Sequence, residues 1–192
     1  MPGRDEIVLG AMMVLLAAVA SVVLLASKRV HCARLARAAQ ALGGKLAPWR
    51  RFFIQEHEVL FACHGHEARL VYFFLGNGRL TRLLFPAPPV APFTFVAKTR
   101  RRLLPGPAPA YEALHVRLSD ERYREALLSP EFCRAAVALC SPPFGADLDV
   151  RASRRAFSIE KSTWIEEPRL LRGYASLAAE MYQAYLKACG LC

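Results

Sequence analysis

Patterns that mark several common enzyme classes are missing from this sequence. It has no Walker-type Gly-Lys-Ser/Thr loop, and Gly76-Asn77-Gly78 lacks the third glycine and the helix that a dinucleotide-binding loop requires. Neither a Gly-x-Ser-x-Gly elbow nor a zinc-binding His-Glu-x-x-His helix occurs. Hydrolase and nucleotide-dependent functions therefore lose their usual support, and the sequence predicts no cofactor.

Acidic residues are scarce relative to basic ones. The 192 residues include 16 Asp and Glu against 26 Lys and Arg, giving a net charge of +10, while 54% of the chain is apolar. Such a composition can bury enough surface to fold, which excludes a disordered chain, and the length suits one domain. A mean hydropathy of +0.21 is high for so basic a protein. The apolar residues must therefore be concentrated in one region.

Charge is absent from residues 7–27, which read IVLGAMMVLLAAVASVVLLAS. As a helix, this run spans about 31 Å, close to the roughly 30 Å hydrocarbon core of a bilayer. A cleaved signal peptide is disfavoured, because Arg4 is opposed by Asp5 and Glu6 and the apolar run is too long. The sequence thus predicts a short flank over residues 1–6, followed by a single transmembrane helix.

Basic residues follow the apolar run, namely Lys28, Arg29, Arg34 and Arg37. By the positive-inside rule we expect the N-terminus outside and the C-terminal part in the cytoplasm, with the chain anchored in the cell (inner) membrane. The helical pattern continues over residues 28–42 as a juxtamembrane helix. It stops at Gly43-Gly44, where a cytosolic domain over residues 43–192 begins.

Small residues at positions 10, 17 and 21 form one stripe on the predicted membrane helix. Gly10, Ala17 and Ser21 would let a partner helix approach closely, which predicts contact with another membrane protein as well as with the bilayer. The alternative is chance, because an Ala-rich apolar helix often shows such a stripe.

The remaining chain alternates short β-rich runs with helical patterns. We expect strands near residues 52–62, 67–75, 80–86, 93–99, 112–118, 146–151 and 155–161. Asn77-Gly78 favours a tight hairpin turn, and helices are expected after Ser119, Ser129 and Glu167. The sequence predicts an α+β fold, in which an N-terminal transmembrane helix precedes a globular domain with an antiparallel β-meander packed by helices.

This order of elements, including the segment YEALHVRLSDERYREALLSPEFCRAAVALC at residues 111–140, resembles bacterial single-pass membrane-anchored families known as domains of unknown function. The resemblance extends over residues 40–188 and lies in the pattern of elements. It implies a membrane anchor before a β-meander and a final hairpin and helix, and it implies no activity.

Four potential metal ligands lie within ten residues: His57, Cys63, His64 and His66. Zinc selects these residue types. In a strand, however, alternate residues point to opposite faces, so only two or three of the four readily converge. The alternative is a hairpin whose turn carries two histidines and whose cysteine packs as a small apolar group. We expect no metal at this hairpin.

The predicted cytosolic part is basic, with 25 Lys and Arg against 14 Asp and Glu once the N-terminal flank is set aside. A run at Lys98, Arg100, Arg101 and Arg102 predicts a surface facing anionic lipid. Nucleic acid is disfavoured, because the basic residues are scattered and no aromatic-basic motif is present. A merely solvated surface is the alternative.

These patterns favour a single-pass membrane protein with a cytosolic binding or scaffolding domain, as an accessory subunit of a membrane complex. We expect binding rather than catalysis. The competing hypothesis is a metal- or thiol-dependent enzyme or sensor centred on the hairpin from His57 to His66.

Overall fold

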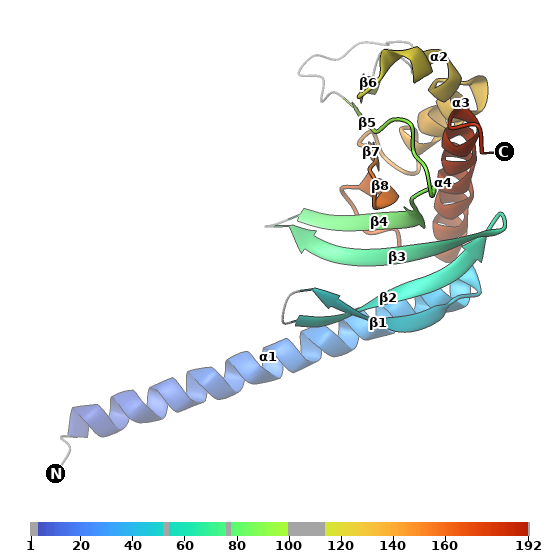
Figure 1. Cartoon of the computed structure of the whole chain (residues 1–192). Helices are drawn as coiled ribbons and strands as arrows, with labels where there is room; N and C mark the ends of the chain where they lie inside the picture. Colours follow the sequence, from blue (N-terminus) through green and yellow to red (C-terminus); the bar gives the residue numbers. More distant parts are fainter. Residues whose placement is uncertain (1–3, 52–53, 76–77, 100–113, 192) are drawn as a thin grey trace.

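A computed structural model describes residues 4–51, 54–75, 78–99 and 114–191. It contains one long helix, α1 (Arg4–Leu42), that projects from an α+β domain, as Figure 1 shows. Within the described chain, α1 is the one helix long and apolar enough to cross a membrane. Its apolar side chains are largely exposed from Met12 to Leu25, as expected for a surface that lipid covers. The predicted fold class is confirmed.

The domain is built on one antiparallel sheet of eight described strands, in the order β1-β2-β3-β4-β8-β7-β5-β6. The strands are β1 (Lys45–Arg51), β2 (Ile54–Cys63), β3 (His66–Leu75), β4 (Gly78–Pro86), β5 (Phe95–Thr99), β6 (Leu114–Leu118), β7 (Asp149–Ala152) and β8 (Ala156–Lys161). Of the strands expected for the meander, β2, β3 and β4 are consecutive neighbours, whereas β5 is separated from β4 by two other strands. The late hairpin of β7 and β8 is inserted between β4 and β5.

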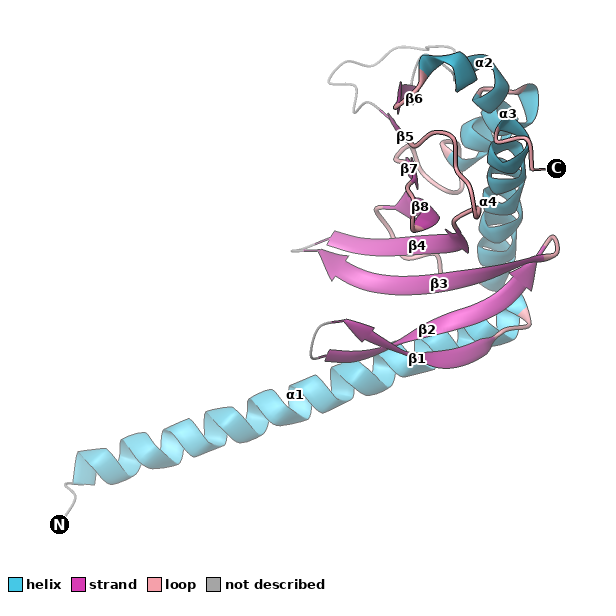
Figure 2. Ribbon diagram, in the orientation of Figure 1, coloured by secondary structure: helices cyan, strands magenta, loops and turns pink. Residues whose placement is uncertain are grey.

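The helices of the domain lie together on one side of the sheet (Figure 2). They are a short 3-10 turn (Glu121–Tyr123), α2 (Arg124–Leu127), α3 (Pro130–Leu139) and α4 (Pro168–Ala188). Ser129 caps α3 by accepting a hydrogen bond from the Phe132 amide, and Pro130 occupies the first turn. The helix predicted after Ser129 is therefore confirmed.

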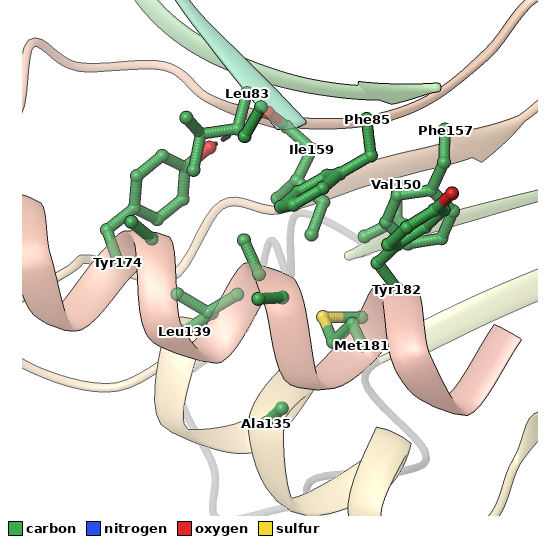
Figure 3. Packing of buried hydrophobic residues seen from close by; sticks show 14 of the residues in the cluster. Leu83, Phe85, Ala135, Leu139, Val150, Phe157, Ile159, Tyr174, Met181 and Tyr182 are labelled. Carbon is green, nitrogen blue, oxygen red and sulfur yellow. Dashed lines mark hydrogen bonds between the residues drawn. The ribbon is translucent and has the colours of Figure 1, made fainter. Parts of the chain in front are cut away.

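The core lies between this side of the sheet and α4, with α3 behind it (Figure 3). Phe157 and Ile159 of β8 are fully buried against Tyr174 and Tyr182 of α4. The Tyr174 hydroxyl donates a 2.8 Å hydrogen bond to the Ile159 carbonyl oxygen, which satisfies the one polar group of that buried ring. Burying large side chains of this kind stabilises a fold by about 1.5–3 kcal/mol each.

The C-terminal third of α1 belongs to this core. Leu35, Ala38 and Ala39 are 0%, 3% and 7% exposed, whereas Leu25 is 61% exposed on the same helix. The helix ends at Leu42 and is followed by Gly43, whose φ of 63° suits glycine. A Cβ on Gly44 would collide with the carbonyl oxygen of Leu60, so the chain turns into β1 in close contact with β2. The candidate membrane helix and the domain are thus continuous.

Strand β1 was not predicted. Its sequence, KLAPWRR, contains Pro48, which cannot donate a hydrogen bond within a sheet. The strand lies at the edge of the sheet, where an unpaired amide position is tolerated, and this explains why proline is accommodated. The first strand was expected to begin at residue 52, which lies outside the described residues, and β2 is described from Ile54.

Candidate functional site

A pocket of about 440 Å³ lies where α1 meets the domain. We call it the root pocket. Its lining comes from α1, the start of β4, the α3–β7 loop, the β8–α4 loop and the first turn of α4. The lining residues are Arg34, Arg79, Pro143, Phe144, Thr163, Trp164, Ile165, Glu166, Glu167 and Leu170. Arginine, glutamate and tryptophan in one cavity offer charge of both signs beside an aromatic surface.

The β8–α4 loop is fixed to the sheet by two buried side chains. The Thr81 hydroxyl donates to the Thr163 carbonyl oxygen at 2.6 Å and accepts from the Ile165 amide at 3.0 Å. The Tyr72 hydroxyl donates to the Ile165 carbonyl oxygen at 2.5 Å. Burial, with a smaller contribution from Glu166, raises the pKa of Tyr72, so this hydroxyl keeps its proton at physiological pH. The loop that carries Trp164 is therefore held against the sheet by side chains of β3 and β4.

The α3–β7 loop is fixed by a lysine with no exposed surface. The Lys161 ammonium donates to the carbonyl oxygens of Leu139 (2.8 Å), Gly145 (2.9 Å) and Asp147. Burial lowers the pKa of Lys161, and the nearby Asp147 opposes that shift. These bonds satisfy the buried charge and hold the loop that brings Phe144 to the pocket wall.

Two guanidinium groups lie over the Trp164 ring. The Cζ of Arg34 is 4.5 Å from the ring centroid and the Cζ of Arg79 is 5.0 Å from it. Attraction between a guanidinium and an indole face contributes about 0.5–1 kcal/mol at exposed sites. The Arg34 Nε also lies 3.1 Å from Oε1 of Glu166. Arg34 thus connects α1 to the β8–α4 loop by both an aromatic and an ionic contact.

His57 and Cys63, two of the four residues considered as candidate metal ligands, have separate surroundings. The Sγ of Cys32 on α1 lies 3.9 Å from His57 Nδ1, while the Cys63 thiol donates to the Ala175 carbonyl oxygen of α4 at 3.5 Å. Burial raises the pKa of Cys63, which favours the neutral thiol over the thiolate that binds zinc.

His64 and His66 also have partners of their own. His64 has a φ of 50° in the β2–β3 turn, and its Nε2 lies 3.1 Å from the Ser176 hydroxyl. The His66 ring meets the Tyr182 ring edge-on at 5.0 Å. In the part of the chain that the structure describes, no group of three or more His, Cys, Asp or Glu side chains is placed to hold a metal ion.

Lys98, the first residue of the predicted lipid-facing run, lies on β5 in an ion pair. Its Nζ is 2.8 Å from Oδ2 of Asp149, directly opposite on β7, and Arg151 contacts the same carboxylate at 2.7 Å. Arg100, Arg101 and Arg102 lie outside the described residues. Part of the charge of Lys98 is thus compensated within the sheet.

The predicted helix-contact stripe lies on the exposed part of α1. Ala17 and Ser21 are exposed, and the Ser21 hydroxyl donates to the Ala17 carbonyl oxygen at 2.8 Å within the helix. Gly10 is part of the same helix.

Sequence reasoning missed the root pocket as a site. It placed Arg34 in the basic flank of the membrane helix and did not single out Arg79 or Trp164. The local sign was a tryptophan among charged residues immediately before a helix start, in the segment TWIEEP. The three residues come together only through the pairing of β4 with β8 and the docking of α1.

The sequence matches no protein-family model and no curated protein. Among solved structures, the chain is similar to the mycobacterial trehalose monomycolate transport factor A, TtfA. The two share 10% sequence identity and superpose with a TM-score of 0.54, over 81% of this chain and 93% of that one. At this identity the similarity shows a shared fold.

Proposed function

We propose that this protein is a membrane-anchored accessory subunit whose cytosolic domain binds or scaffolds the components of a membrane complex. The observation that carries the proposal is the continuity of anchor and domain, since Leu35 of the long helix is fully buried in the domain core. A flexible linker would only keep a domain near the membrane. A continuous helix also fixes how the domain is oriented, which is a property that an accessory subunit needs.

The fold supports a role in transport. TtfA, with which the chain shares its fold, is a trehalose monomycolate transport factor. A domain of the same architecture on a candidate membrane helix suits an accessory protein of a transport system in the membrane.

The charge distribution supports a cytosolic domain. Lys28, Arg29, Arg34 and Arg37 follow the apolar segment, whereas only Arg4 precedes it. By the positive-inside rule this asymmetry supports a cytoplasmic domain, with the anchor in the inner membrane as part of the proposal. Fusion of alkaline phosphatase after Cys192 should give no activity, and a fluorescent protein that requires the cytoplasm should be active there. The reverse pattern would overturn this orientation.

Photo-crosslinking in native membranes tests the accessory role. A benzoylphenylalanine at Ala17 reports on the stripe of small residues, while the same group at Val19, which is 53% exposed, lies on the other side of the helix. We expect a discrete adduct with an integral membrane protein from Ala17 and much less from Val19. Equal crosslinking from both positions, or adducts with lipid alone, would contradict a helix partner at this stripe.

A further inference from the structure

We propose that the root pocket binds the headgroup of an aminophospholipid, with the phosphate held by Arg34 and Arg79 and the primary amine held by Glu166 and Glu167. This inference rests on the membrane anchoring proposed above. It assigns a ligand class to a site that contains charges of both signs in one cavity of about 440 Å³.

In the proposed anchored protein, the root pocket lies close to the layer of lipid headgroups. Arg34 follows Ser27, the last residue of the uncharged segment, by seven positions in one continuous helix, or about 10 Å along its axis. The polar layer on each side of a bilayer is roughly 5–8 Å thick, and a tilted helix brings Arg34 closer to it. Arg79 is the second residue of β4. The start of this strand lies on the side of the domain nearest the N-terminal half of α1 (Figure 1).

The two arginines retain hydrogen-bond donors for a phosphate. Arg34 uses Nε for Glu166, which leaves its terminal nitrogen atoms available. Arg79 forms no ion pair with any residue that the structure describes. Both groups contact the same indole, that of Trp164, so their like charges are held near one another. A phosphate that accepts from both guanidinium groups offsets this repulsion.

The two glutamates distinguish a zwitterionic ligand from an anionic one. Glu166 uses Oε1 for Arg34, and Glu167 precedes α4 without making a capping hydrogen bond from its side chain. A headgroup with phosphate alone would place its charge near two carboxylates and satisfy neither. An ammonium a few bonds from the phosphate pairs with them, as in phosphatidylethanolamine.

The walls of the pocket are fixed before a ligand arrives. Thr81 and Tyr72 hold the loop that carries Trp164, and Lys161 holds the loop that carries Phe144. A preorganised site loses less conformational entropy on binding than a flexible one. This rigidity favours selection of one headgroup over general attraction to a charged surface.

Native mass spectrometry of the full chain in detergent micelles tests the proposal, with phosphatidylethanolamine, phosphatidylglycerol and phosphatidylcholine added in equal amounts. The wild type should retain phosphatidylethanolamine at least about fivefold more than either other lipid. Arg79→Gln, which breaks no ion pair described here, should weaken that binding about tenfold. Glu166→Gln with Glu167→Gln should abolish the preference over phosphatidylglycerol. Equal retention of the three lipids by the wild type would overturn the proposal.

A matched control removes one arginine charge outside the root pocket. Arg154→Gln is exposed and lies outside the root pocket, so it should leave lipid retention unchanged. If Arg154→Gln and Arg79→Gln weaken binding equally, the site is not the root pocket. Glycerophosphoethanolamine should compete with the lipid and inorganic phosphate should not; competition by phosphate alone would assign the pocket to a free anion. Carbonate extraction separately tests the anchor, so failure of the pocket and failure of membrane insertion are distinguishable.

Discussion

Arg34 and Glu166 form an ion pair between α1 and the loop before α4, with Nε and Oε1 3.1 Å apart. The pair lies at the boundary between anchor and domain, and both side chains are partly shielded from water. Partial shielding makes such a pair stronger than a fully exposed one, although still modest.

A double-mutant cycle with Arg34→Gln and Glu166→Gln should give a coupling energy of roughly 0.5–1 kcal/mol in chemical unfolding of the full chain. Arg134 and Glu180 provide a control, since they are 3.4 Å apart and the Arg134 side chain is 70% exposed. That pair should give about 0–0.5 kcal/mol. Equal coupling in both cycles would contradict a special contribution at the helix boundary.

Leu35→Ala should lower the free energy of unfolding of the domain by about 2–5 kcal/mol, because it opens a cavity around a side chain with no exposed surface. Leu25→Ala makes the same chemical change on the same helix, where the side chain is 61% exposed. It should leave the domain's unfolding within about 0.5 kcal/mol of the wild type. Similar losses from both changes would mean that α1 does not enter the core as described.

Lys161→Met should destabilise the domain by roughly 2–4 kcal/mol, because buried carbonyl oxygens of Leu139, Gly145 and Asp147 lose their donor. Lys187→Met, at an exposed position in the last turn of α4, should change stability by less than about 0.5 kcal/mol. Urea unfolding monitored by circular dichroism measures both. A stable Lys161→Met variant would show that the α3–β7 loop does not need this support.

Glu58→Gln should stabilise the protein at neutral pH and have little effect in acid. Glu58 is 5% exposed, and burial raises its pKa, while Arg69 partly opposes the shift. The folded state therefore holds the proton more tightly than the unfolded state, and stability falls as pH rises from the ordinary value of 4.5 through the folded pKa. Glutamine at this position carries no ionisable proton, so it removes the loss of stability that accompanies ionisation of Glu58.

The melting temperature of Glu58→Gln should exceed that of the wild type by roughly 2 °C at pH 7 and should equal it near pH 4. Glu67→Gln on neighbouring β3 is the control, because its side chain is 67% exposed and contacts the same Arg69. Its melting temperature should follow the wild type across the pH range. A destabilised Glu58→Gln at pH 7 would mean that the ion pair with Arg69 outweighs the cost of burial.

Features that depend on neighbours in the chain could be predicted. The uncharged run predicted the exposed part of α1. The alternation around Val150, Phe157 and Ile159 predicted two strands, and these apolar residues are fully buried in the structure. The amphipathic spacing of Tyr174 and Ala178 likewise gave α4 and its buried face. Hydrophobic periodicity determines these features locally, so the sequence was sufficient.

Features that depend on distant pairings were not accessible in the same way. Nothing in the pattern of β7 and β8 indicates that they insert between β4 and β5, because strand order follows from packing of the whole sheet. The root pocket has the same origin, since Arg34, Arg79 and Trp164 belong to segments far apart in the chain. The metal hypothesis arose from sequence proximity, but the turn at His64 directs neighbouring side chains to different partners.

Helix α1 continues without interruption into the domain core, so movement of the helix also moves the domain. The helix has 39 residues and is about 58 Å long. A small change in its tilt therefore moves one end of the helix by several ångströms relative to the other. Bilayers of different thickness impose different tilts on a long apolar helix. Because α1 is one helix from Leu25 to Leu35, a change in its tilt within the proposed membrane would also change the orientation of the sheet, including edge strand β1.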